Sequence, residues 1–479
     1  MLKVENLRKV KDYNFIRPQN SVSSNIISSI PPEGLLINKP GKYVFTNNIQ
    51  WNPASLINVA LFIVAPNVTI DFNGFTLESS ITDTLSTAIL ALDTRNICFE
   101  NGNIFNMGLI GIICINTENV NFCNLVISRI SAQNLAFPAI GILIANSRCI
   151  NINRITIKDI DVTAFTLSAI LLIDTVYSNI TYSDIHNLRN SAGVCAGLSY
   201  INCAKSNARY LNISRLETLT LANSFAPGHT CIGIVVFQSE RIKCDKCCIK
   251  DITGSCDDAH GISFFVVRNG IIKNCHVENV IDGKDASAAA KATGIEIYGW
   301  TDISDNSLSR NSIRSPSNIL VKNCHVKNII ALNPGDKQAA GFSVAGSCVK
   351  FVCCTAKNVA VYNGDFISDI CTGLGYGFAW APDIRDAFIY PAYEVIYDRC
   401  EASYCQVGFD TFYHINSKWD SVKSCENGVD ILKLNHTRKV LFCNQCSECP
   451  DVPPGEFKYV PIDNIACNNS IRMVPCCDN

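Results

Sequence analysis

The stretch Gly261-Ile-Ser-Phe, followed by a short β-rich run that closes on Glu278-Asn-Val, contains the repeat that decides the fold. Similar glycine strands recur roughly every 30 residues, an interval typical of solenoid repeats. Copies begin at Gly111, Gly141, Gly233, Gly261, Gly294, Gly341, Gly408 and Gly428, with weaker copies near Ala169 and Gly197. The closing run recurs at Lys158-Asp-Ile, Lys250-Asp-Ile, Lys327-Asn-Ile and Lys357-Asn-Val.

Short strands without a helical pattern between them exclude βαβ units. They fit a coil of parallel strands in which each turn buries its apolar face against the next. We therefore predict an all-β fold, a single-stranded right-handed parallel β-helix of about eleven coils. The predicted parts are an N-terminal arm (1–33), an opening segment or cap (34–80), the β-helix (81–436) and a cysteine-rich C-terminal cap or tail (437–479).

Polar residues repeat in columns that support this prediction. Asn279, Asn328 and Asn358 fall in one column, and Asp159 and Asp251 occupy equivalent turns. Stacked strands lie about 4.8 Å apart, so like residues can form hydrogen-bonded ladders. A second column, of cysteines, lies four residues before the asparagine column. We expect it to be a buried stack of structural thiols, with a redox or metal-binding role as the alternative. It contains Cys247, Cys275, Cys324 and Cys354.

Composition excludes several classes of protein. The net charge is −2 and no basic run stands out, so we expect no nucleic-acid partner. The longest apolar run, 59–66, is too short for a membrane span, and the first residues lack the apolar core of a secretory signal. We therefore expect a soluble chain that is not exported by the usual route and whose 26 cysteines are mostly reduced.

The segment Asn67-Val-Thr-Ile-Asp-Phe-Asn-Gly-Phe-Thr-Leu, followed by the coils, resembles the first rungs of the pectate-lyase-like right-handed β-helix superfamily. The resemblance covers roughly residues 34–434. It is specific for fold but a poor guide to function, because that fold carries lyases, hydrolases, epimerases, phage tailspikes and non-catalytic binding proteins. The composition, rich in isoleucine, asparagine and cysteine, further resembles that of β-helix repeat proteins of large DNA viruses. This implies a non-enzymatic, virion-associated, spike-like surface protein, assembled in the host cytoplasm, that contacts capsid proteins and surface polysaccharide. The alternative is a glycoside hydrolase or polysaccharide lyase.

Two acidic groups are candidates for catalysis. Asp257, Asp258 and His260 cluster before a glycine strand, where they could serve acid–base hydrolysis, bind Ca²⁺ or simply form a turn. The cluster faintly resembles the polygalacturonase pattern, although the order of the elements differs. Asp410 and Asp430 should face outward on neighbouring rungs about 5 Å apart, as in a retaining carboxylate pair, or form a solvated acidic patch. Glu296 should lie too far away to join that pair.

The outward residues of the glycine strands are aliphatic in the first half of the chain, as at Leu143, and more aromatic later. We predict that the aromatic ones stack on sugar rings; they are Phe237, Phe265, Tyr298 and Phe412. Such an apolar strip should not face water uncovered. Either inserted loops or other subunits cover it, and we favour a homotrimer.

The C-terminal segment is rich in cysteine. A four-cysteine zinc site is one interpretation, beside disulfides and free thiols; its ligands would be Cys443, Cys446, Cys449 and Cys467. The close triple spacing is unlike the usual pair-plus-pair arrangement of zinc ligands. We expect no organic cofactor.

Overall fold

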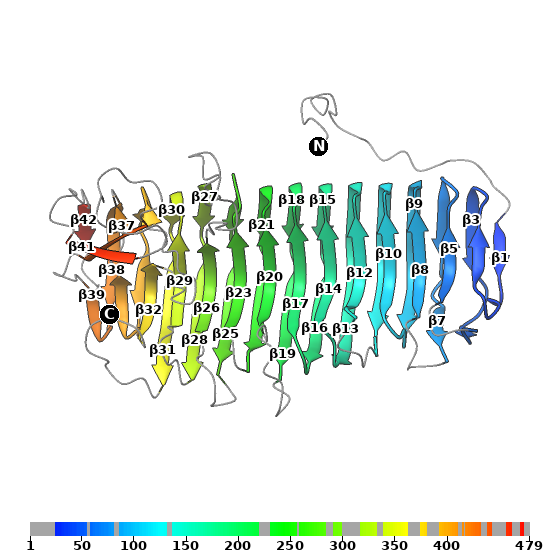
Figure 1. The fold of residues 1–479 in the computed structure, drawn as a ribbon, viewed down its shortest axis with the longest axis horizontal. Helices are drawn as coiled ribbons and strands as arrows, with labels where there is room; N and C mark the ends of the chain where they lie inside the picture. The colour runs from blue at the N-terminus through cyan, green and yellow to red at the C-terminus, as the bar shows by residue number, and fades with distance from the viewer. Residues whose placement is uncertain are drawn as a thin grey trace, which may run out of the picture.

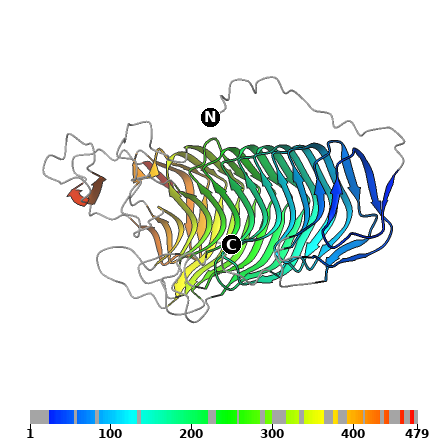
Figure 2. The same cartoon turned by 45° about the vertical axis from the view of Figure 1, so that its right-hand side comes forward.

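The chain forms an elongated rod of stacked coils (Figures 1 and 2). The computed structural model describes residues 24–54, 58–80, 86–131, 137–219, 230–255, 258–283, 291–298, 317–332, 339–362, 374–380, 392–410, 414–415, 417–432, 438–442, 457–461 and 470–473. Within these ranges every regular element is a β-strand, and no helix there is long and apolar enough to cross a membrane. The fold is the predicted right-handed parallel β-helix.

One side of the rod is a 14-stranded parallel sheet, called sheet B, to which each coil gives one strand. Its strands are β2 (Leu35–Ile37), β5 (Val59–Ile63), β8 (Thr87–Leu92), β10 (Ile110–Ile115), β12 (Ala139–Ala145), β14 (Thr166–Ile173), β17 (Val194–Ile201), β20 (Cys231–Phe237), β23 (Asp258–Phe265), β26 (Lys291–Tyr298), β29 (Ala339–Ala345), β32 (Gly375–Trp380), β36 (Val407–Asp410) and β39 (Val429–Leu432).

The remaining coil strands form a 26-stranded sheet that bends at a corner into two faces. Face A1 contains β1 (Asn25–Ile27), β3 (Gly41–Phe45), β6 (Val68–Asp71), β15 (Val176–Thr181), β18 (Ala204–Arg209), β21 (Glu240–Asp245), β24 (Ile271–Lys273), β27 (Ser317–Lys322), β30 (Ser347–Val352), β33 (Ala392–Tyr393), β34 (Ile396–Asp398) and β37 (His414–Ile415). Face A2 contains β4 (Ile49–Trp51), β7 (Thr76–Ser79), β16 (Asp184–Asn190), β19 (Asn212–Thr218), β22 (Cys248–Thr253), β25 (His276–Asp282), β28 (His325–Leu332), β31 (Thr355–Tyr362) and β35 (Glu401–Ser403).

Four longer strands run through both faces: β9 (Arg95–Phe105), β11 (Glu118–Ser128), β13 (Arg148–Val162) and β38 (Lys418–Cys425). Strand β42 (Ser470–Met473) pairs with β38. Strands β40 (Arg438–Phe442) and β41 (Phe457–Pro461) form a separate antiparallel pair. The predicted division of the chain at residues 33, 80 and 436 stays a prediction, while pairing in sheet B runs without a break from β2 to β39.

Asparagines make the bends of the coil and tie neighbouring coils together, as predicted. Asn279, Asn328 and Asn358 have φ angles of 59°, 57° and 56°, a left-handed conformation that asparagine tolerates better than most residues. The Nδ2 of Asn358 donates to Asn328 Oδ1 at 2.8 Å, and Asn328 Nδ2 donates to Asn279 Oδ1 at 2.9 Å. Asn279 in turn donates to Asp251 at 2.7 Å, and in a second part of the same column Asn187 donates to Asp159 at 2.7 Å.

The predicted cysteine column is also present, as buried free thiols at the corner before face A2. The strand register places Cys247, Cys275, Cys324 and Cys354 on successive coils and adds Cys400 as a fifth member. Each thiol lies within 3.3–3.7 Å of a backbone carbonyl oxygen two residues before it. These contacts give the sulfurs polar partners inside the core, which fits the structural interpretation.

Close packing between coils favours the glycine that most sheet B strands carry at one position. A Cβ at Gly261 would collide with a methyl group of Val277 and would lie 2.5 Å from the carbonyl oxygen of Gly294 on the next coil. The glycine repeat in the sequence did not identify two of the sheet B strands. Strand β8 has Ala88 where its neighbour β10 has Gly111, and β32 carries Gly377, which stacks between Gly341 and Gly408.

Candidate functional site

The outer face of sheet B changes character along the rod. On β10, β12 and β14 the outward residues Ile113, Leu143 and Leu171 are half-buried, as in an apolar strip that is partly open. On β26, β29, β32 and β36 every residue is buried. The predicted strip of outward residues is therefore covered in the second half of the rod.

Four ionisable side chains meet on the closed part of sheet B, and we call them the polar cluster. The ammonium Nζ of Lys291 lies 2.6 Å from Glu296 Oε1. The other Glu296 oxygen, Oε2, lies 3.4 Å from Nδ1 of His260, and the Nε2 of His260 lies 3.9 Å from Asp258 Oδ2. The side chains of His260 and Glu296 are only 2% and 1% exposed, so the charges interact in a poorly hydrated environment.

Parallel pairing between neighbouring coils creates this cluster. Strand β23 pairs with β26 so that Asp258 lies opposite Lys291 and Ser263 opposite Glu296. Strand β26 pairs with β29 so that Glu296 lies opposite Ser343. Glu296 therefore has a serine hydroxyl on each side.

Several buried polar atoms of this region lack hydrogen-bond partners. Five of the eight such atoms among the described residues belong here: His260 Nδ1, Ser263 Oγ, Thr293 Oγ1, Glu296 Oε2 and Ser343 Oγ. Buried polar groups are almost always satisfied, so a concentration of exceptions on three adjacent strands marks a site where a bound polar group would be stabilised.

Aromatic rings border the polar cluster. Phe265 and Tyr298 lie opposite each other on β23 and β26, with ring centroids 6.0 Å apart and planes at 75°. His260 meets Phe265 edge-on at 6.5 Å, and Lys291 Nζ lies 6.0 Å from the Tyr298 ring centre. Phe237, on β20, lies opposite Phe265 and is half-buried.

The structure thus brings together residues that the sequence placed in separate groups. Asp258 and His260, predicted as catalytic, lie beside Phe265 and Tyr298, predicted as sugar-binding. Sequence reasoning missed Lys291, and it considered Glu296 only in relation to Asp410 and Asp430. The alignment of Gly261 with Gly294 contains both residues, because this register sets Asp258 beside Lys291 and Ser263 beside Glu296.

The second acidic pair has a different register from the predicted one. Asp410 lies opposite Leu432 rather than Asp430. The reason is that Val407 pairs with Val429, which displaces Gly428 by two residues from the position opposite Gly408. Asp430 therefore sits on the neighbouring strand but two residues away along it, further from Asp410 than the predicted 5 Å. Asp410 is 7% exposed, so it is buried rather than open in a groove.

Other predicted residues lie outside the described part of the chain, namely Asp257, Phe412, Cys443, Cys446, Cys449 and Cys467. The side chain of Asp430 is likewise not described. Among the residues that are described, no group of three or more histidine, cysteine or acidic side chains could hold a metal ion. The zinc site therefore stays a prediction.

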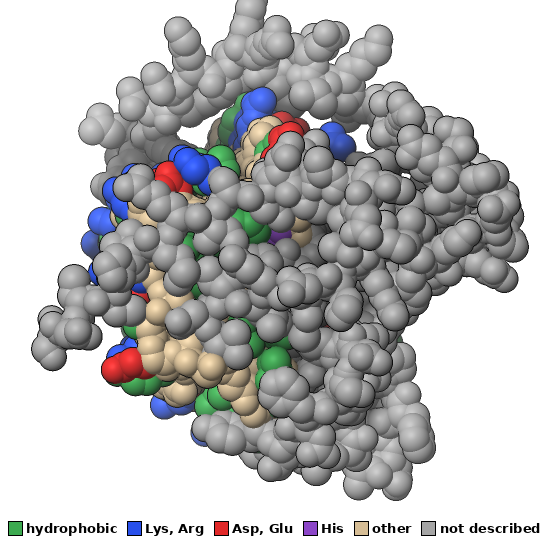
Figure 3. Space-filling model, turned by 90° about the vertical axis from the view of Figure 1, so that its left-hand side faces the viewer, with side chains coloured by type: hydrophobic (Ala, Val, Ile, Leu, Met, Phe, Trp, Pro, Cys, Tyr) green, Lys and Arg blue, Asp and Glu red, His purple; other side chains and the backbone are tan. Residues whose placement is uncertain are grey.

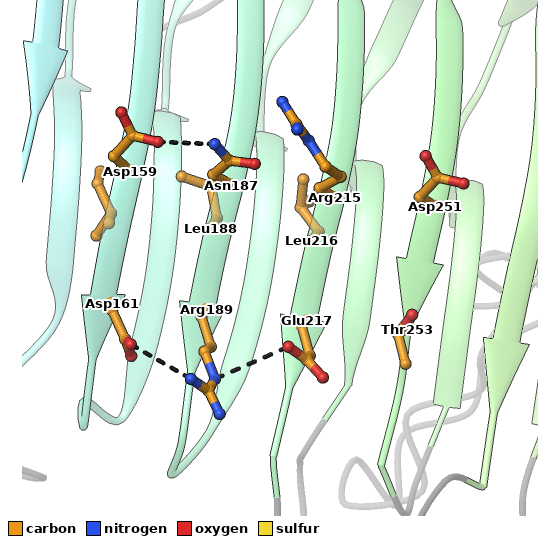
Figure 4. A pocket seen from close by; sticks show the side chains of 11 residues that line it. Asp159, Asp161, Asn187, Leu188, Arg189, Arg215, Leu216, Glu217, Asp251 and Thr253 are labelled. Carbon is orange, nitrogen blue, oxygen red and sulfur yellow. Dashed lines mark hydrogen bonds and ion pairs between the residues drawn. The ribbon is translucent and has the colours of Figure 1, made fainter.

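A groove of about 520 Å³ runs over face A2, across β13, β16, β19 and β22 (Figure 4). Arg189 lies 3.5 Å from Asp161 and 3.8 Å from Glu217, so one guanidinium links two carboxylates across three coils. Next to this row, Asn187 donates to Asp159 at 2.7 Å. The side chains of Asp161 and Arg189 are 64% and 46% exposed, so this groove is open to solvent.

The end view of the rod also shows charged groups reaching the surface. Seen from the C-terminal end, Lys and Arg side chains gather along one side of the surface that the structure describes (Figure 3).

The polar cluster and the groove differ in their exposure to solvent. The polar cluster is enclosed, whereas the groove is accessible.

No family model and no curated protein sequence matches the chain. Solved structures that are similar to it include the catalytic domain of a GH87 α-1,3-glucanase in complex with nigerose, at 13% identity and a TM-score of 0.36, over 73% of this chain and 64% of that one. A tailspike protein of E. coli bacteriophage HK620 matches at 10% identity and a TM-score of 0.48, over 81% of this chain and 65% of that one. PfbA, a surface adhesin of Streptococcus pneumoniae, matches at 10% identity and a TM-score of 0.42, over 88% and 92%. The chain thus spans less than two thirds of the first two proteins.

Proposed function

We propose that this chain is a non-enzymatic, spike-like surface protein of a large DNA virus that binds a glycan in the groove of face A2. The observation that carries the binding proposal is the contrast in exposure between the two polar sites. A polymer can reach Asp161 and Arg189, whereas Glu296 is 1% exposed and already pairs with Lys291. A volume of about 520 Å³ is typical of ligand sites.

The groove offers the kind of groups that recognise sugars. Carboxylates, an amide and guanidiniums, with both donors and acceptors, repeat from coil to coil in the groove. Hydroxyl groups of a sugar can donate hydrogen bonds to the carboxylates and accept them from the guanidiniums. Because the row follows the stacking direction of the coils, an extended glycan chain could lie along it.

Binding of full-length protein to neutral polysaccharides such as dextran and laminarin tests this proposal. Arg215→Ala, within the groove, should weaken binding about tenfold, the loss expected for hydrogen bonds made by a charged group. Arg399→Ala is the matched control, since Arg399 has a similar left-handed backbone (φ 52°, against 56° for Arg215), lies outside the groove and pairs with Asp398. Equal binding by both variants and the original chain would refute the groove as the glycan site.

The apolar half of sheet B supports assembly into the proposed homotrimer. The half-buried residues Ile113, Leu143 and Leu171 form one column over three coils, and burying such a strip between subunits is favourable. Light scattering should give three times 52.5 kDa with and without reductant, and Leu143→Glu should lower that mass. A monomer at the same concentrations would contradict the trimer.

A second candidate function is polysaccharide cleavage by the polar cluster. The five unsatisfied polar atoms favour it, because active sites tolerate such costs. Against it, His260 occupies the space between the carboxylates of Asp258 and Glu296, where a hydrolase would hold its substrate. Release of reducing sugars or unsaturated uronates by the original chain, abolished in Glu296→Gln, would replace the non-enzymatic proposal.

A further inference from the structure

A row of tyrosine and basic side chains lies at the corner between faces A1 and A2. Four successive coils place Arg154, Tyr182, Tyr210 and Lys246 there, all with left-handed backbone and φ of 50–56°. Thr181, Arg209 and Asp245, the residues before the last three, pair in register, so the corner residues stack along the rod. The rings of Tyr182 and Tyr210 stack at 4.7 Å with an angle of 10°.

The hydroxyl group of Tyr210 receives hydrogen bonds from two cations. Lys246 Nζ donates to it at 3.1 Å and Arg209 Nη2 at 3.2 Å, and both cations also lie 4.7–5.0 Å from the ring centre. Because its oxygen is occupied as an acceptor, the phenol proton of Tyr210 is left to donate toward solvent. The same two cations lower the pKa of Tyr210 from its usual value. Three donors therefore converge on one point of the surface.

The surroundings carry an excess of positive charge. Arg209, Lys243 and Lys273 lie 3.5–3.6 Å from one carboxylate oxygen of Asp245, which is 4% exposed. The single negative charge of Asp245 cannot neutralise these three cations and the nearby ammonium group of Lys246. An anion placed at the surface would therefore gain favourable interactions with the remaining charge.

The two strands of face A1 that precede β21 lack acidic side chains, and Glu240 at the start of β21 pairs with Arg241 at 3.2 Å. On β15 and β18 the sequences Val-Tyr-Ser-Asn-Ile-Thr and Ala-Lys-Ser-Asn-Ala-Arg contain no carboxylate. At the far end of these strands a second pair repeats the arrangement, because Lys205 Nζ donates to Tyr177 Oη at 2.7 Å and lies 4.8 Å from its ring centre. Between the two tyrosine–lysine pairs, Asn179 and Asn207 are exposed amides that can bind hydroxyl groups.

We infer that this corner of the rod, centred on Tyr210, Arg209 and Lys246, binds the carboxylate or sulfate group of an acidic glycan. Charge-assisted hydrogen bonds from Arg and Lys suit such groups, and the amides suit the sugar hydroxyls. A single-stranded nucleic acid fits less well. The ring of Tyr210 is already in contact with Tyr182, Arg209 and Lys246, which leaves little free aromatic face for bases, and the whole chain carries a net charge of −2.

The site is separate from the groove of face A2 and has the opposite charge, so the two proposals can fail independently. The test measures binding of the full-length protein to oligogalacturonate, dextran sulfate, neutral dextran and a thymidine oligonucleotide, each at low and at high salt. We expect oligogalacturonate or dextran sulfate to bind, and the stronger of the two identifies the anionic group. Tyr210→Phe, which removes only the hydroxyl, should weaken this binding about tenfold. Lys246→Gln should weaken it further and reduce its dependence on salt.

The chain offers a matched control at another corner. Tyr404 is 51% exposed, has a φ of 54° and carries the single cation Lys357 4.9 Å from its ring centre. Tyr404→Phe should leave acidic-glycan binding unchanged, and Arg215→Ala should affect only neutral glycans. The inference is overturned if Tyr210→Phe binds oligogalacturonate and dextran sulfate as the original chain does. It is equally overturned if neutral dextran competes with them, or if the oligonucleotide binds more tightly.

Discussion

Replacing Lys291 by methionine tests whether the polar cluster is an ion pair that depends on both partners. The Lys291 and Glu296 side chains are 6% and 1% exposed and meet at 2.6 Å. Lys291→Met would leave the Glu296 carboxylate buried opposite an uncharged group of similar length. Breaking a buried ion pair on one side costs about 3–5 kcal/mol, because the remaining charge keeps its desolvation penalty.

The loss should be local, since each coil contacts mainly its neighbours. Hydrogen exchange of the β26 amides would measure it as a drop of about 3–5 kcal/mol in their opening free energy. In the double variant Lys291→Met with Glu296→Met both charges are absent, and we expect most of the stability to return. A change below about 1 kcal/mol in the single variant would show that the pair is hydrated, and the enclosed cluster described above would be refuted.

Three further predictions concern the coil itself. Hydrogen bonds from Lys327, His276 and Lys250 hold the pKa of Glu278 at about 2, below the usual 4.5, so the stabilisation by its carboxylate is complete above pH 4.5 and is lost as the pH falls toward 2. The melting temperature of Glu278→Gln should therefore fall less over this range than that of the original chain. Asn328→Val should lower the free energy of chemical unfolding by about 2–4 kcal/mol, because it loses two ladder hydrogen bonds and forces a β-branched residue to a φ of 57°. Asn328→Gly loses the same hydrogen bonds without the backbone strain, so an equal cost in both variants would show that strain contributes nothing. Gly261→Ala should lower the melting temperature through its clash with Val277, and adding Val277→Ala should restore part of it; no recovery would contradict the packing argument.

Repetition explains how much of the fold could be predicted. The asparagine and cysteine columns follow from sequence spacing alone, because each coil repeats the same bend and Asn328 needs only its equivalents above and below it. The prediction weakened where the repeat changed length. Gly428 was aligned with Gly408 by residue type, yet the backbone aligns Asp430 with Gly408, since Val407 pairs with Val429.

The polar cluster and the corner site escaped prediction for a related reason. Their members come from different coils, so Glu296 and His260 are distant in sequence and only the register brings them together. Likewise, Arg209, Lys246 and Lys273 belong to separate coils and never appear as a basic run. The sequence predicted that the outer face of sheet B is covered, but it could not show which coils are, because the coil pattern is the same for open and closed coils.

The column of five free thiols has a chemical consequence. In-register strands hold equivalent residues about 4.8 Å apart, which lies within the Cα separation of about 4.4–6.8 Å that a disulfide spans. Spacing therefore does not keep Cys275 and Cys324 from joining each other, and it is their burial in the core that limits access of an oxidant. A crosslink between two members of the column would record that the core had opened far enough to admit an oxidant, so the rate of thiol oxidation would measure local opening of the coils.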